Sequence, residues 1–206
     1  VIEYQPTQVY ALHMLGVVTY QLGSPHEAKQ LLTKAIKIAP NNADIHNNLA
    51  LILSENSLKL EALNHLNRAI ELCPDLTEAF YNRGINLQAI DYLDEAETDF
   101  LEAIRLQPNH IEALYSLGVT QQMQNRLGEA IQNLKNGIKV EPNNPDLHWN
   151  LSLALLQNGE FEEGWREYEW RWKMPKFSVF FREIAAPIWD GQALAGKTLY
   201  IPVSYT

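Results

Sequence analysis

The sequence predicts an all-α protein built from a row of antiparallel helix pairs, which is an α-solenoid. Three observations predict this fold class. Prolines recur in steps of 34 residues, each step has room for two amphipathic helices, and small residues recur in the same step. The recurring prolines are Pro6, Pro40, Pro74, Pro108 and Pro142.

Each period is expected to hold two helices. Between 42 and 74, the segment 45–55 carries apolar side chains at helical spacing, a break follows at 56–57, and a second amphipathic run ends at Cys73. Pro74 cannot continue a helix interior, so it ends the second helix.

Helix caps are predicted from polar residues next to the prolines. Ser24 is expected to cap a helix that starts at Pro25, with Glu27 completing a capping box. The residues that follow the other prolines are expected to cap the next first helix of each pair. They are Asn41, Asp75, Asn109 and Asn143.

Two columns of small residues predict a close helix crossing inside each pair. Because glycine in a helix interior costs roughly 1 kcal/mol relative to alanine, its recurrence needs a packing reason. We expect the glycines of the first helix to face alanines of the second helix. The glycines are Gly16, Gly84 and Gly118, and the alanines are Ala28, Ala96 and Ala130.

The period, the Leu-Gly pairs 15–16 and 117–118, the alanine column and the terminal proline resemble the tetratricopeptide repeat (TPR). The resemblance implies a right-handed TPR superhelix with a short irregular or β C-terminal tail. The units expected from it are 9–42, 43–76, 77–110, 111–144 and a degenerate 145–175. Residues 1–8 are expected to end a truncated preceding repeat. Residues 176–206 are expected to form a linker and the start of a truncated domain, with a strand at 197–201.

The C-terminal third is rich in aromatic residues. At helical spacing Phe161, Trp165, Tyr168 and Trp172 share one face, whereas Trp170 does not. Two interpretations stay open: a capping helix that covers the end of the solenoid, or a docking surface for a following domain. The segments 164–172 and 187–199 resemble the junction in bacterial TPR proteins that carry a C-terminal glycosyltransferase-like domain.

Composition excludes several functional classes. The 206 residues hold 25 Asp+Glu against 16 Lys+Arg, a formal net charge of −9, so neither nucleic acid nor an anionic membrane is an expected partner. The single cysteine allows no intramolecular disulfide and no cysteine-based zinc site. With no stretch of about 18 apolar residues and no signal-peptide pattern, a cytoplasmic location is expected.

No enzyme motif occurs, so no catalytic residue, cofactor or metal site is expected. His46 and His148 occupy the same repeat position and are expected to be packing residues. The acidic stretches 91–97 and 162–163 are expected to be solvated, and Cys73 to be a buried, inert thiol.

Binding is therefore the expected activity, in the concave groove that the resemblance implies for the first helices. One column of this groove holds Met14, Asn48, Asn82, Ser116 and Asn150, and the column before it holds His13, Asn47, Tyr81, Tyr115 and Trp149. An asparagine amide offers one acceptor and two donors, which match a peptide bond. The predicted peptide-binding residues are Asn47, Asn48, Tyr81, Asn82, Tyr115, Ser116, Trp149 and Asn150.

The asparagine column resembles the asparagine ladder of the O-linked N-acetylglucosamine transferase TPR domain, with departures at Met14 and Ser116. The alternative is that the asparagines make hydrogen bonds between helices, because asparagine is a poor helix former that needs some compensation. Both roles stay open from the sequence.

Acidic residues near the start of the first helices disfavour a carboxylate clamp of the chaperone type and favour neutral or basic ligands. They are Asp44, Glu78, Glu112 and Asp146. The sequence thus predicts a protein-interaction scaffold that binds an extended peptide or partner segment. Two alternatives are the substrate-recruiting arm of a glycosyltransferase-like enzyme and a homo-oligomer formed through exposed solenoid ends.

Overall fold

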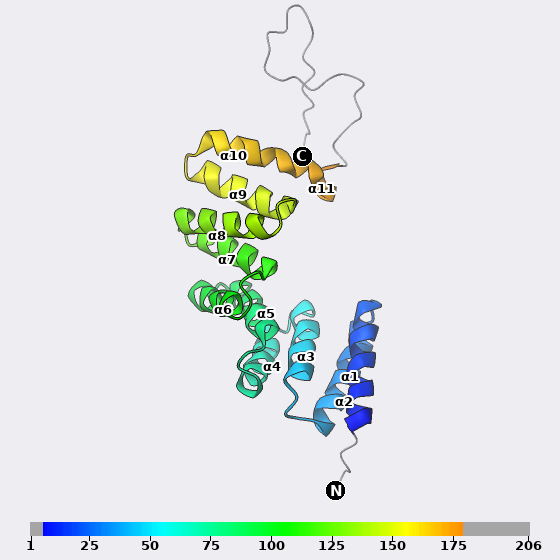
Figure 1. The fold of residues 1–206 in the computed structure, drawn as a ribbon. Coiled ribbons are helices and arrows are strands. Elements are labelled where there is room, and N and C mark those ends of the chain that lie inside the picture. The colour runs from blue at the N-terminus through cyan, green and yellow to red at the C-terminus, as the bar shows by residue number, and fades with distance from the viewer. Residues whose placement is uncertain (1–5, 179–206) are drawn as a thin grey trace, which may run out of the picture.

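The computed structural model of the chain describes residues 6–178, and this part consists of helices and turns without a strand (Figure 1). The predicted all-α class is therefore confirmed. The helices are α1 (Pro6–Gln21), α2 (Pro25–Ile38), α3 (Ala43–Glu55), α4 (Lys59–Leu72), α5 (Thr77–Gln88), α6 (Leu93–Leu106), α7 (Ile111–Met123), α8 (Leu127–Val140), α9 (Pro145–Gln157), α10 (Phe161–Tyr168), the 3₁₀-helix η1 (Glu169–Lys173) and α11 (Pro175–Ser178).

The helices stack as pairs into a curved array (Figure 1). We call α1, α3, α5, α7 and α9 the first helices, and α2, α4, α6, α8 and α10 the second helices. The backbones of neighbouring first helices approach one another along the whole row, whereas those of neighbouring second helices lie farther apart. A row that packs more closely lies on the inside of a bend, so the first helices form the inner, concave side of the array.

In three of the five pairs, the helices cross at a glycine of the first helix, and Ala50 and Ser152 take this place in the other two. A Cβ atom added at Gly84 would lie 2.6 Å from Cε1 of Phe100, and one at Gly118 would lie 2.7 Å from Cγ of Leu134. Gly16 stands in the same way against Leu32. The predicted close crossing is present, but the glycine makes room for the large residue one turn beyond the alanine column.

The core is a continuous series of fully buried aliphatic and aromatic side chains, and small residues let neighbouring pairs approach. A Cβ atom at Gly137 of α8 would lie 2.8 Å from Leu147 of α9. At the same repeat position the other second helices place fully buried alanines, namely Ala35, Ala69 and Ala103. Large side chains of the core with no exposed surface include Leu32, Leu66, Phe100, Leu134 and Leu155.

Each first helix ends at a residue in the left-handed region, again in steps of 34. The values of φ are 81° at Gly23 and 83° at Gly159, where glycine carries no steric penalty. Ser57, Asp91 and Asn125 adopt φ of 60° to 66° at the equivalent places. This left-handed position sets the tight turn from the first helix into the second.

The predicted caps are wrong by one residue. The side chain of Asn42 accepts a hydrogen bond from the backbone of Ile45, and Asn144 accepts from 146 and 147, so the residue after the predicted one caps the helix. His110 does the same for α7, whereas Leu76 offers no side-chain cap. Ser24 precedes Pro25 as expected but makes no capping hydrogen bond.

The N-terminal end of the array exposes apolar side chains that are buried in other repeats. Leu15 and Val18 of α1 are 53% and 48% exposed, while their equivalents Leu49 and Ile52 in α3 are 4% and 1% exposed. Repeats after the first cover this face with the second helix of the preceding pair. The α1 face therefore has the character of an inter-repeat surface.

The predictions for the two chain ends have different outcomes. Helix α1 already begins at Pro6, whereas residues 1–8 were expected to belong to a preceding repeat. The expected strand at 197–201, most of the expected linker and the segment 187–199 lie outside the described residues.

Replacing Gly84 by Ala is expected to destabilise the protein by about 1–3 kcal/mol, because the new methyl group overpacks the crossing against Phe100. Gly128 of α8 is the matched control, since a Cβ atom there would meet nothing within 4 Å. Gly128→Ala should leave stability unchanged or raise it by up to about 1 kcal/mol. Thermal and urea denaturation followed by circular dichroism measure both; equal effects would contradict the packing argument.

Candidate functional site

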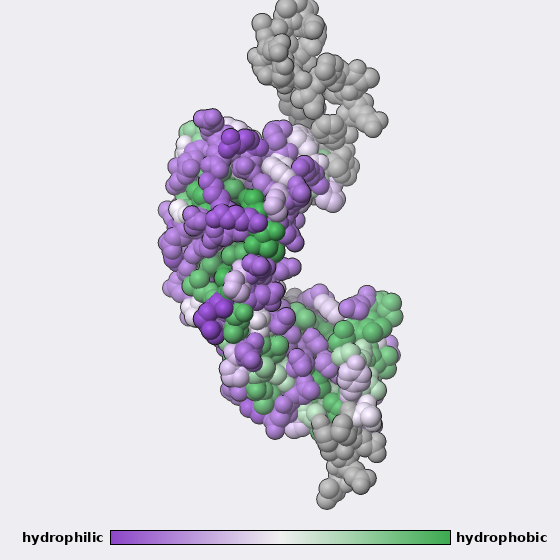
Figure 2. Space-filling model, in the orientation of Figure 1, coloured by the Kyte–Doolittle hydropathy of each residue, from purple (hydrophilic) through white to green (hydrophobic). Residues whose placement is uncertain are grey.

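The concave face is built from the side of the first helices on which neighbouring repeats meet. Figure 2 shows the hollow of the array on its right-hand side, with hydrophobic surface bordering it. The two predicted columns lie on this side, because their members reach each other between repeats. What these side chains do is decided by their hydrogen bonds.

The predicted asparagine column makes a series of hydrogen bonds from one repeat to the preceding one. Nδ2 of Asn82 donates to Oδ1 of Asn47 over 2.9 Å, and Nδ2 of Asn150 donates to the hydroxyl of Tyr115 over 3.1 Å. Nδ2 of Asn48 lies 2.7 Å from Nε2 of His13. Each bond joins residues 35 apart, so the column and its neighbour are linked along the array.

Ser116 takes the place of asparagine in the fourth repeat and bonds the preceding tyrosine. Burial raises the pKa of Tyr81, against a smaller opposing effect of its hydrogen bond to Ser116. Burial likewise raises the pKa of Tyr115, and the hydrogen bond to Asn150 opposes this effect. In the fourth repeat, the hydroxyl of Ser116 thus replaces the asparagine amide in the series of hydrogen bonds between repeats.

The sequence left two roles open for the asparagines, peptide binding and hydrogen bonding between helices. These bonds favour hydrogen bonding between helices. Asn47 and Asn82 are 7% and 8% exposed, and the amide of Asn82 is directed at the neighbouring repeat. The N–H that Asn82 donates to Asn47 is occupied within the protein, while the amide keeps a second N–H donor and its own acceptor. The predicted columns therefore hold neighbouring first helices in register.

A third column on the same side was missed by the sequence analysis. It lies four residues, or about one helical turn, after the column of Asn47 and Tyr81. All five members are aliphatic and half-buried. We call this column the apolar strip; it consists of Val17, Leu51, Ile85, Val119 and Leu153. The signal was present in the sequence as an aliphatic residue every 34 positions.

The acidic residues predicted at the start of the first helices are all exposed, in the first turn of their helix. Each lies seven residues before a member of the apolar strip, which is two helical turns on the same face. We call these four residues the acidic row: Asp44, Glu78, Glu112 and Asp146. The concave face thus carries an acidic edge parallel to an aliphatic strip.

In the last repeat, the groove residue Trp149 is covered by aromatic side chains that follow it in the sequence. The ring of Trp149 lies 4.9 Å, centroid to centroid, from the rings of both Tyr168 and Phe177. Trp170, which the helical pattern placed off the aromatic face, stacks on His148 at 3.7 Å. The phase changes because α10 ends at Tyr168 and the chain continues as the 3₁₀-helix η1.

A complete aromatic cap is not formed. Phe161 and Trp165 are 62% and 57% exposed, although the capping interpretation expected them to cover the end of the array. The cover over the last first helix comes instead from Trp170 and Tyr168.

The histidines at the shared repeat position are structural, as expected. Nε2 of His46 donates to the carbonyl of Pro40 and Nε2 of His148 to that of Pro142, which ties each first helix to the preceding turn. Since His46 donates through Nε2, its Nδ1 accepts from Nδ1 of His65 at 2.9 Å. Burial lowers the pKa of His65, and the neighbouring His46 adds to this effect. Nδ1 of His148 bonds Glu167 instead.

The expected solvation is confirmed at Asp91, Asp94 and Glu95 but is wrong at Glu97, and the expected burial of Cys73 is wrong. Glu97 is 9% exposed rather than solvated, because it accepts hydrogen bonds from Arg126 and from Gln121. Cys73 is partly exposed, and its Sγ donates to Oδ1 of Asp75 at 3.0 Å. That hydrogen bond, more than burial, raises the pKa of the thiol and keeps it protonated.

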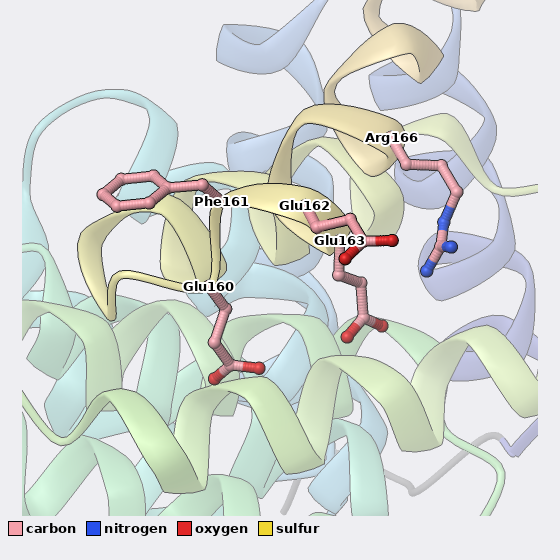
Figure 3. A pocket seen from close by; sticks show the side chains of 5 residues that line it. All are labelled: Glu160, Phe161, Glu162, Glu163 and Arg166. Atoms are coloured by element: carbon pink, nitrogen blue, oxygen red, sulfur yellow. The ribbon is translucent and has the colours of Figure 1, made fainter.

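A shallow pocket lies at the start of α10, lined by Glu160, Phe161, Glu162, Glu163 and Arg166. Figure 3 shows that the ring of Phe161 points away from the glutamates. A second pocket involves Tyr92, Leu93, Asp94 and Glu95, which are the equivalent residues two repeats earlier. The repeat geometry at the turn therefore produces both pockets. Among the described residues, no group of three or more His, Cys, Asp or Glu side chains could hold a metal ion.

A curved stack of helix pairs with one continuous inner face defines a helical-repeat protein of the solenoid class. Family models for the tetratricopeptide repeat match residues 9–42 and 77–110, residues 31–64 and 100–132, and residues 123–159. Together these matches cover more than half of the sequence. The chain belongs to the tetratricopeptide repeat family, as the sequence resemblance indicated.

Solved structures share this fold. A double mutant of MamA from Desulfovibrio magneticus RS-1 has a TM-score of 0.74 at 16% identity, over 83% of this chain and 96% of that one. PilF of Pseudomonas aeruginosa also has 0.74, at 22% identity, over 80% and 75%. YrrB, described as a TPR protein with an unusual peptide-binding site, has 0.67 at 15% identity, over 82% and 87%. At these identities the likeness concerns the fold alone.

No curated protein matches the sequence. In residues 6–178, none of the helices has both the length and the apolar character needed to cross a membrane.

Replacing Asn82 by Ala is expected to destabilise the array by about 1–3 kcal/mol, because the buried Oδ1 of Asn47 loses its donor. The double variant Asn47→Ala/Asn82→Ala should cost less than the sum of the two single variants, since no unpaired acceptor is left. Exposed Asn109 is the control, and Asn109→Ala should leave stability within about 0.5 kcal/mol. Strict additivity in denaturation experiments would contradict the bond between repeats.

Proposed function

We propose that the concave face binds an extended segment of a partner protein. The observation that carries this proposal is the apolar strip, in which five aliphatic side chains in five successive repeats stay half-buried on the inner side of the array. A continuous apolar strip on a concave surface is typical of a surface that another chain covers.

In this proposal the predicted groove residues have two different tasks. Asn47, Asn48, Asn82, Ser116 and Asn150 hold the first helices in register and thereby align the apolar strip. The rings of Tyr81 and Tyr115 stand between the apolar strip and the acidic row, where they offer flat contact area to a bound segment. The similarity in fold to YrrB, whose description names a peptide-binding site, supports a role of the same kind.

Replacing Leu51 and Val119 together by Ser is expected to weaken peptide binding by about tenfold or more, because each change removes apolar area at the centre of the strip. The ligand source is a library of unstructured random peptides displayed on phage, selected on the immobilised wild-type chain. Selected peptides are then measured by fluorescence anisotropy against wild type and variant.

The matched control is Leu60→Ser/Leu101→Ser, which removes two exposed leucines from second helices. It should change affinity by less than about twofold. The proposal fails if selected peptides bind both double variants equally well, or if selection yields no specific binder.

A second candidate role is self-association through the end of the array. Leu15 and Val18 of α1 are exposed on the face that other repeats use for stacking, and Leu22, just after α1, is exposed as well. A second helix from another copy, placed as α2 is placed on α3, would cover them. Such a head-to-tail contact joins two different surfaces and can continue into larger assemblies.

Light scattering over a wide range of protein concentration tests this role. The mean mass is expected to rise with concentration for the wild type and to stay at that of one chain for Leu15→Glu/Val18→Glu, because burying two carboxylates against an apolar face is costly. Leu60→Glu/Leu101→Glu is the control and should associate as the wild type does. A strict monomer at millimolar concentration would rule this role out.

A further inference from the structure

The Lys and Arg residues of the helix pairs lie almost entirely on the second helices, whereas carboxylates occur on both sides of the array. The first helices contain five carboxylates and a single cationic residue, Arg83. The carboxylates are Asp44, Glu55, Glu78, Glu112 and Asp146. The second helices carry twelve Asp and Glu residues together with nine Lys and Arg residues, which are Lys29, Lys34, Lys37, Lys59, Arg68, Arg105, Lys135, Lys139 and Arg166.

Arg83 does not offset the acidic character of the concave face. Its guanidinium makes two hydrogen bonds, of 2.7 and 2.8 Å, to the carboxylate of Asp99 in α6, and a third to Asn67 in α4. Both partners belong to second helices, and Asp99 is only 3% exposed. The positive charge is thus neutralised on the far side of α5 from the apolar strip.

The acidic row faces solvent without a Lys or Arg partner among the described residues. Of its four members only Glu112 has a close imidazole neighbour, His110, whose Nδ1 lies 3.2 Å away and accepts a hydrogen bond from the backbone of Ala113. Exposed carboxylates that pair with Arg lie on second helices, such as Glu71 and Glu129, or in η1, where Glu169 pairs with Arg171. A position in the first turn suits an acid because of the helix dipole, but that effect gives no reason for excluding cations from the whole inner side.

Apolar and acidic residues therefore recur together along the groove. On each first helix, the acidic residue and the aliphatic residue of the strip are two helical turns apart, which is about 10 Å. The same two residues recur on the next first helix, at the helix-to-helix distance of about 8–10 Å. An extended chain rises about 3.3 Å per residue. One step of the groove thus corresponds to about three residues of an extended ligand.

We propose, on the basis of the function proposed above, that the ligand of the concave face is an extended segment with one apolar and one basic residue in each stretch of about three. Its apolar side chains lie on the apolar strip, and its Lys or Arg side chains reach the acidic row. An acidic segment is repelled by the same row, so charge selects among segments of equal apolar content.

Three synthetic peptides of about twelve residues test the proposal: repeats of Lys-Val-Ser, of Ser-Val-Ser and of Glu-Val-Ser. Fluorescence anisotropy is measured with the whole chain at low salt and again at about 0.5 M salt. The lysine peptide is expected to bind at least about tenfold tighter than the glutamate peptide, with the serine peptide between them. The difference should shrink at high salt, because exposed charges are screened.

The variant Glu78→Lys/Glu112→Lys is expected to weaken binding of the lysine peptide by about tenfold at low salt and to improve binding of the glutamate peptide. Glu27→Lys/Glu95→Lys is the matched control, since both glutamates are exposed and lie in the first turn of second helices. It makes the same change of net charge and of helix-dipole contacts, and should alter either affinity by less than about twofold.

The outcomes separate this inference from the function on which it rests. Suppose random peptides bind the wild type, lose binding in Leu51→Ser/Val119→Ser, and show no enrichment in Lys or Arg. The concave face then binds peptides, and the basic ligand class is wrong. The basic ligand class is also wrong if Glu78→Lys/Glu112→Lys and Glu27→Lys/Glu95→Lys change the affinity for the lysine peptide equally. If neither selected nor synthetic peptides bind, the proposed function fails and the inference fails with it.

Discussion

The packing of each first helix against the first helix of the preceding repeat is the contact on which the concave face depends. The bonds between Asn82 and Asn47 and between Asn150 and Tyr115 fix this contact at one register. Polar bonds suit the task, because aliphatic contacts alone tolerate sliding, whereas a buried amide loses its partner when the helices shift. Alignment of the apolar strip over five repeats follows from that register.

The close crossing inside each pair is the second constraint. Gly84 allows α5 to approach Phe100, and the same device recurs in the first and fourth repeats. Together with the left-handed residue after each first helix, such as Asn125, it gives every pair nearly the same shape. Identical units stacked with identical offsets must form a regular curve, and this curve creates one inner and one outer side.

The placement of Lys and Arg side chains then follows the division of the two sides. Lys135 of α8 forms an ion pair with Glu163 of α10, and Arg126, just before α8, forms one with Glu97 of α6. The inner side carries carboxylates and aliphatic groups, while amides such as those of Asn82 and Asn150 make hydrogen bonds between repeats. Under the proposed function, stability of the array and selectivity for a ligand depend on different side chains of the same helices.

The sequence by itself determined the period, the helix pairs and the family, because prolines, glycines and alanines act on the backbone locally and recur at a fixed step. It also indicated which residues, such as Asn48 and Asn82, share the inner side. Only the tertiary structure decided what these amides do, since their partners, His13 and Asn47, lie 35 residues away and come within reach only when repeats stack. The same stacking buried Glu97 beside Arg126. Local patterns specify a helix and its faces; the distance between two helices is set by packing.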